Sequence, residues 1–69
     1  MKFTDTWYQN RLRKHFDKYF EDFKYDAEFY PDPAPNQWLF DIPGLNLKFR
    51  LTCYDDGRVR ETQEIILRR

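Results

Sequence analysis

Hydrophobic positions in the first third of the chain recur every three or four residues, as they do on one face of an α-helix. The positions in this apolar stripe are Tyr8, Leu12, Phe16, Tyr19, Phe20 and Phe23. Such spacing predicts an amphipathic helix, which we place over residues 5–24. Thr6 with Gln9 three residues later fits a capping box, in which each side chain bonds a free backbone N–H at the helix start.

After the helix, apolar and polar residues alternate, which is typical of strands. We predict strands over residues 25–30, 37–42, 45–54 and 58–67. A proline-rich stretch, residues 31–35, separates the first two strands because proline disrupts regular structure. Pro43-Gly44 and Asp55-Asp56-Gly57 mark tight turns between the later strands.

The turn lengths predict how the last three strands pair. A two-residue turn at Pro43-Gly44 places Phe40 opposite Leu47. A three-residue turn at residues 55–57 places Cys53 opposite Val59. Both registers put the apolar side chains on one face, which is how strand register is normally set.

The predicted fold is α+β, with one N-terminal amphipathic helix packed on a four-stranded antiparallel sheet in an α-β-β-β-β meander. We expect residues 1–69 to form a single small domain. Glu61 and Gln63 fall on the inner face of the sheet in this register. We therefore expect either a bulge or an uncovered patch there.

Composition limits the chemistry that the chain can perform. Among its 69 residues are one cysteine (Cys53), one histidine (His15), two well-separated glycines and no serine. These counts exclude an intrachain disulfide, the common zinc sites, a serine triad and a glycine-rich phosphate loop. We expect no catalytic residue, metal or cofactor, and we interpret Cys53 as a buried, unreactive thiol. His15 flanks the apolar stripe, so we expect it at the boundary between helix and sheet.

Hydropathy gives no sign of a membrane segment or a signal peptide, because no apolar run approaches the length that either requires. The lone cysteine fits a reducing compartment. We therefore expect a cytoplasmic protein.

A second stripe on the helix carries positive charge. We call it the helix ridge; it comprises Trp7, Arg11, Lys14 and Lys18, spaced four, three and four residues apart. By helical angle it lies nearly opposite the apolar stripe. It is either a solvated face or a contact surface, since Trp and Arg are enriched at interface hot spots.

The face of the sheet that points away from the helix is a second charged surface, because no further helix remains to cover it. This outer sheet face includes Lys48, Arg50, Thr52, Tyr54, Arg58, Arg60, Thr62 and Glu64. Basic groups beside an aromatic ring on an open sheet are typical of single-stranded nucleic-acid sites. The formal net charge of zero gives little support to that interpretation.

The high aromatic content, 20%, and the absence of catalytic apparatus favour a small non-enzymatic interaction module. Such a module would dock on a larger protein as an accessory subunit, adaptor or inhibitor, including inhibitors of the phage counter-defence type. The expected partner-binding residues are Trp7, Arg11, Lys14, Lys18, Lys48, Arg50, Tyr54, Arg58 and Arg60.

Two alternatives stay open at this point. The first is a single-stranded nucleic-acid-binding protein that uses the basic outer sheet face. The second is a homodimer that pairs through the last strand, since unpaired strand edges invite such pairing.

Overall fold

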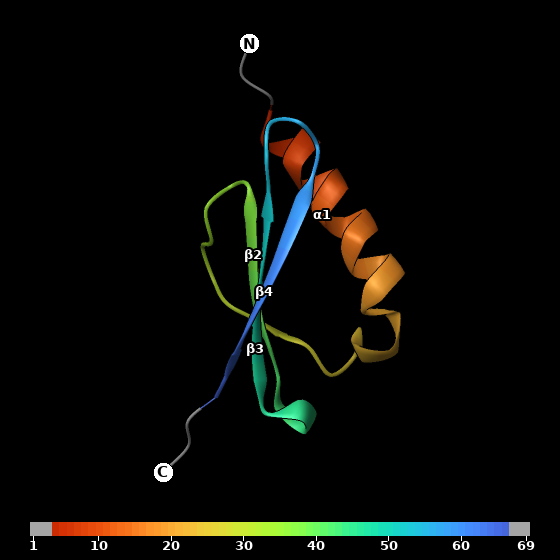
Figure 1. Cartoon of the computed structure of the whole chain (residues 1–69), viewed down its shortest axis with the longest axis vertical. Coiled ribbons are helices and arrows are strands. Elements are labelled where there is room, and N and C mark those ends of the chain that lie inside the picture. The colour runs from red at the N-terminus through yellow and green to blue at the C-terminus, as the bar shows by residue number, and fades with distance from the viewer. Residues whose placement is uncertain (1–3, 67–69) are drawn as a thin grey trace.

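The computed structural model describes residues 4–66, and its architecture confirms the predicted α+β meander. Helix α1 (Asp5–Tyr19) is followed by a 3₁₀ turn, η1 (Glu21–Phe23), and then by four antiparallel strands. The strands are β1 (Glu28–Phe29), β2 (Gln37–Ile42), β3 (Leu47–Cys53) and β4 (Val59–Ile65), with a second 3₁₀ turn, η2 (Pro43–Leu45), before β3. They lie in the order β1-β2-β3-β4, and α1 runs along one side of the sheet (Figure 1).

The helix begins at Asp5, as predicted, but its N-cap residue and its end differ from the prediction. Thr4, not Thr6, is the N-cap, and its hydroxyl accepts a hydrogen bond from the Trp7 N–H at 3.2 Å. The helix ends at Tyr19 instead of residue 24, because Phe20 leaves helical geometry at φ −124°. The 3₁₀ turn η1 then redirects the chain and keeps Phe23 packed against the core.

The core lies between α1 and the inner face of β2 and β3. Its buried members are Leu12, Phe16, Phe20, Phe40, Ile42, Phe49, Leu51 and Cys53. The rings of Phe16 and Phe20 each meet Phe40 edge-on with centroids 5.2 Å apart, a favourable aromatic geometry. Tyr19 is 58% exposed, so the prediction that it belongs to the apolar stripe is wrong: α1 turns it toward β4 instead of toward the core.

The side chain of Gln9 joins three separate segments. Its amide nitrogen donates to the Pro35 carbonyl at 2.8 Å, and its amide oxygen accepts from the Trp38 indole N–H at 2.7 Å. Gln9 thus fixes the proline-rich loop and β2 against the helix. It has no part in the capping box that the sequence suggested.

Strand β1 is only two residues long, whereas the sequence predicted a strand over residues 25–30. The turn that follows η1 occupies the positions before Ala27, where the N–H groups of Asp26 and Ala27 both donate to the Phe23 carbonyl. The Tyr30 N–H still donates to the Leu39 carbonyl at 2.9 Å. These local bonds leave Glu28 and Phe29 as the residues that pair with β2.

The predicted register between β2 and β3 is wrong by two residues. Phe40 pairs with Phe49, not with Leu47, because the connection is the four-residue segment 43–46 instead of a two-residue turn. Asn46 closes it in the left-handed region at φ 56°. A shift of two residues keeps each paired side chain on its predicted face, so the faces of β2 and β3 that form the core were still predicted correctly. Leu45, which was predicted to begin the third strand, lies in η2 and is 46% exposed.

The register between β3 and β4 is confirmed, with Cys53 opposite Val59 and Leu47 opposite Ile65. Pairing is continuous from Val59 to Ile65, so β4 has no bulge. Glu61 and Gln63 lie on the inner face and are exposed, which confirms the expected uncovered patch. β4 was predicted over residues 58–67; it spans Val59–Ile65 within the described residues, and position 67 lies outside them.

Candidate functional site

The helix ridge lies along the border between α1 and β4, not on the far side of the helix. The guanidinium of Arg11 reaches Gly57 in the β3–β4 turn, where a Cβ would stand 2.9 Å from its Nη1. Figure 1 shows this turn lying beside the first turns of α1. The spacing of residues along the helix could not predict this contact between Arg11 and the turn, because it does not show where the distant hairpin packs.

Trp7 is partly buried instead of standing free at the end of the ridge. It packs against the core cluster, and its ring meets Tyr8 edge-on at 5.2 Å. The Arg11 guanidinium lies 4.4 Å from the centre of the Trp7 ring, within cation–π range. Trp7 therefore packs beneath the ridge, and its ring favours one position of the Arg11 guanidinium.

Two grooves open along the ridge. The larger, of about 270 Å³, runs between α1 and β4, and the smaller, of about 200 Å³, lies beside the start of the helix. Arg11 and Lys14 line both. The remaining lining residues of the larger groove are His15, Lys18, Tyr19, Gly57 and Val59, and those of the smaller are Trp7 and Asn10.

In the part of the chain that the structure describes, none of the three ridge cations forms an ion pair with a carboxylate. Within residues 4–66, the ion pairs join His15 to Glu61 and Arg58 to Asp56. Arg11, Lys14 and Lys18 are all exposed and take part in neither pair. The groove thus offers three cations to an anionic partner.

The sequence did not single out Tyr19 or Val59 as residues of this groove. Tyr19 stands four positions after His15, and their rings lie 4.6 Å apart. The i, i+4 spacing on a helix could have placed the two side by side. The position of Val59 depends on how the hairpin packs, which no local pattern records.

His15 lies at the helix–sheet boundary, as predicted. Its Nε2 is 3.4 Å from Oε1 of Glu61 on β4. The contact joins α1 to the otherwise uncovered part of the last strand.

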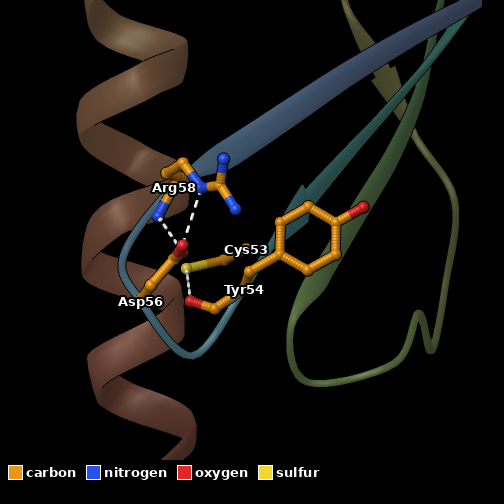
Figure 2. A network of polar contacts seen from close by, with 4 residues as sticks. All are labelled: Cys53, Tyr54, Asp56 and Arg58. Carbon is orange, nitrogen blue, oxygen red and sulfur yellow. Dashed lines mark hydrogen bonds and ion pairs between the residues drawn. The ribbon is translucent and has the colours of Figure 1, made fainter.

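Polar contacts hold the β3–β4 turn that forms one wall of the groove (Figure 2). The Asp56 carboxylate accepts from the Arg58 N–H at 3.0 Å and from its Nε at 2.6 Å. The backbone bond, reinforced by the guanidinium, lowers the pKa of Asp56 below its usual value. Nearby, the Tyr8 hydroxyl donates to Asp55 at 2.5 Å, a bond that raises the pKa of the tyrosine.

The thiol of Cys53 points toward α1, whereas the neighbouring Tyr54 ring points the opposite way (Figure 2). Cys53 is fully buried, as expected. Burial raises the pKa of its thiol, although the charge of Arg11 acts in the other direction. A thiol in this state is a poor nucleophile.

The outer sheet face brings together the remaining predicted site residues. Arg50, Tyr54, Arg58 and Arg60 are exposed, and Tyr54, Arg58 and Arg60 border a hollow of about 400 Å³. Among residues 4–66, one of the four basic residues of this face takes part in an ion pair. Arg58 is paired with Asp56, and Lys48 stands between Asp41 and Glu64 in the strand register.

Tyr30, which was not among the predicted site residues, is a second aromatic residue beside this face. The Lys48 ammonium lies 4.7 Å from the centre of its ring. The Tyr30 hydroxyl donates to Asp41 at 2.8 Å, which raises the pKa of the tyrosine. With the ring engaged by Lys48 and its hydroxyl by Asp41, Tyr30 is not an open stacking platform.

Among residues 4–66, no group of three or more His, Cys, Asp or Glu side chains is placed to hold a metal ion. In the same part of the chain no helix has the length and apolar character that crossing a membrane requires. Comparisons of the chain with protein-family models, with curated proteins and with solved structures give no match.

Proposed function

We propose that the protein is a small interaction module that docks on an acidic surface of a larger protein through the helix ridge. The observation that carries this proposal is the arrangement of Arg11. Its guanidinium lies between the Trp7 ring and Gly57, at the place where the two grooves meet. A cation held in place before binding loses less conformational freedom when the partner arrives.

The neighbouring side chains support a protein partner. Apolar and aromatic groups (Trp7, Tyr19 and Val59) line the grooves together with the cations. Aromatic and Arg side chains around a small pocket are the usual composition of protein–protein hot spots. An acidic segment with one apolar anchor would fit both the charge and the lining of the larger groove.

The outer sheet face gives less support to the nucleic-acid alternative. Arg58 is held by Asp56, and Lys48 lies over the Tyr30 ring with Asp41 and Glu64 opposite it in the strand register, whereas affinity for nucleic acid comes mainly from Lys and Arg that are free to contact phosphates. On this proposal, the residues of that face contribute to solubility and to sheet stability.

The test is affinity capture from nuclease-treated lysate of the native host with three baits. These are the unaltered chain, the double variant Lys14→Glu/Lys18→Glu, and Arg13→Glu as a matched control. Arg13 is exposed on the same helix but faces Trp38 on β2, with its guanidinium 5.8 Å from that ring. All three positions are exposed, so the fold is expected to persist, and circular dichroism checks this.

We expect a defined protein to be recovered by the unaltered chain and by Arg13→Glu, and to be lost with the double variant. Recovery of the same proteins by all three baits would refute the proposal. Recovery of nucleic acid alone from an untreated lysate, lost as salt is raised, would favour the outer sheet face instead.

A further inference from the structure

Strand β4 leaves one edge of the sheet open. β4 is last in the order β1-β2-β3-β4, so one of its edges pairs with β3 and the other has no neighbouring strand. The Tyr54 N–H donates to the Arg58 carbonyl, and the Ile66 N–H donates to the Asn46 carbonyl, at the two ends of the β3–β4 ladder. Backbone groups alternate along an antiparallel strand. The even-numbered residues of β4 therefore face β3, and the odd-numbered residues direct their N–H and C=O groups outward.

This edge lacks two of the features by which proteins usually protect an open strand. β4 contains neither a proline nor a bulge, and residues 60–65 are all exposed. Charged side chains, including those that point toward the core, are a further protection. Glu61 is such a residue, and its carboxylate lies 3.4 Å from His15 of α1. On β4, however, the charges of Arg60 and Glu64 are opposite in sign and symmetrically placed about Thr62.

We propose that β4 pairs with β4 of a second copy of this chain, antiparallel, about a twofold axis at Thr62. This register sets Arg60 of each copy opposite Glu64 of the other on the outer sheet face. On the inner face it sets Val59 opposite Ile65, which is 71% exposed in the single chain. The outward N–H and C=O groups of the odd-numbered residues then bond one another, as antiparallel pairing requires. Complementary charges and apolar groups on directly opposed positions each favour the pairing.

Other registers of the two β4 strands bring together less complementary side chains, so the axis at Thr62 is favoured. An axis at Glu61 would set that carboxylate against its own copy. An axis at Gln63 would set Glu61 against the apolar Ile65 and would leave Arg60 without Glu64. Registers that pair odd-numbered with even-numbered residues are excluded, because only one strand would then offer its outward groups.

The resulting dimer would have one continuous eight-stranded sheet with both α1 helices on the same side. Directly opposed residues of an antiparallel pair project from the same face, so the two inner faces are continuous. The border of α1 with β4, which carries the helix ridge, would then face the corresponding border of the other copy across the paired β4 strands. This proposal rests on the edge of β4 and does not depend on what the ridge binds.

The test exchanges the charges of the proposed pair. Arg60→Glu alone sets two pairs of like charges face to face in the homodimer, and Glu64→Arg alone does the same with the opposite sign. Mixing these two variants restores both oppositely charged pairs in a mixed dimer. Arg50→Glu is the matched control, because Arg50 is exposed on the same face but lies on β3, away from the edge.

Sedimentation and native mass spectrometry give the readout over concentrations up to the millimolar range. We expect the unaltered chain and Arg50→Glu to dimerise, and each edge variant alone to dimerise about tenfold more weakly or worse. The mixture of the two edge variants is expected to form the mixed dimer preferentially. A chain that stays monomeric throughout, or a dimer that none of these exchanges affects, would overturn the proposal.

A proline at position 63 gives a second test that does not involve charge. The Gln63 N–H points away from β3, so Gln63→Pro removes an edge donor without removing a bond of the sheet, and proline is tolerated on edge strands. We expect this variant to keep the circular dichroism spectrum of the fold and to lose the dimer. A folded proline variant that still dimerises would also overturn the proposal.

Discussion

Replacing Gly57 with alanine tests how the β3–β4 turn forms one wall of the groove. Gly57 has φ +89°, a backbone conformation that residues other than glycine rarely adopt. An added Cβ would also stand 2.9 Å from Nη1 and 3.1 Å from Cζ of Arg11. The substitution therefore combines backbone strain with displacement of the arginine that lines both grooves.

The expected loss of stability follows mainly from the strain. A left-handed backbone costs an L-residue about 1–2 kcal/mol relative to glycine. Crowding adds little to this cost, because the atoms in the way belong to the end of a flexible side chain. A domain of this size loses about 4–8 °C in melting temperature per kcal/mol. We therefore expect Gly57→Ala to melt about 4–16 °C below the unaltered chain.

Gly44→Ala is the matched control, because among residues 4–66, its two chain neighbours aside, no atom lies within 4 Å of the added Cβ, and its φ is outside the positive range. Its free energy of unfolding should change by about 0.5 kcal/mol or less. Thermal and urea unfolding followed by circular dichroism measure both variants. Equal stability of Gly57→Ala and Gly44→Ala would refute the account of the turn.

A double-mutant cycle with Arg11→Ala separates strain from crowding. If crowding is small, Gly57→Ala should cost nearly the same free energy whether or not Arg11 is present. A cost that disappears in the Arg11→Ala background would show that the clash, not the backbone, dominates.

Three further predictions concern the Gln9 hydrogen bonds, the Asp56 carboxylate and the buried Cys53 thiol. Gln9→Ala should cost about 1–2 kcal/mol in urea unfolding, because it leaves the Trp38 indole N–H and the Pro35 carbonyl without their partner, whereas Asn10→Ala, one position on, should be nearly neutral. The lowered pKa of Asp56 means that its carboxylate stabilises the fold above the usual titration range of aspartate, and that this contribution is lost as the pH falls through the folded-state value. The stability difference between the unaltered chain and Asp56→Asn should accordingly shrink in acid, and a difference independent of pH would contradict the assignment. Cys53 should react with a thiol reagent only as fast as the protein opens, because its side chain is buried; immediate labelling of the native protein would show otherwise.

The parts of the fold that the sequence predicted correctly depend on local periodicity. The helical repeat of Leu12, Phe16 and Phe20 identified the buried face of α1 and of the residue that caps its C-terminal end. The Asp55-Asp56-Gly57 turn fixed the β3–β4 register because its glycine takes the left-handed conformation that such turns need.

The errors arise where tertiary contacts override local signals. Thr6 had a suitable partner in Gln9, but the tertiary bonds of Gln9 to Pro35 and Trp38 use that side chain, and Thr4 caps instead. Pro43-Gly44 looked like a complete two-residue turn, yet the left-handed Asn46 extends it. Asparagine adopts that conformation more readily than most residues, so this signal was present in the sequence.

The sequence identified the cations that line the larger groove but not the other residues of its lining. The spacing of Arg11, Lys14 and Lys18 identified the ridge, and all three line the larger groove. The opposite wall comes from Gly57 and Val59, whose distance along the sequence hides their proximity. Because only the hairpin packing brings them to the helix, periodicity could not have placed them there.

Lysine footprinting tests the central claim, that the helix ridge is the binding surface, most directly. The two candidate surfaces carry separate lysines, Lys14 and Lys18 on the ridge and Lys48 on the outer sheet face. The captured complex and the free chain are treated with an amine-reactive reagent, and modification of each lysine is measured by mass spectrometry. The account predicts that the partner protects Lys14 and Lys18 and leaves Lys48 as reactive as in the free chain. Protection of Lys48 with Lys14 and Lys18 still reactive would contradict it.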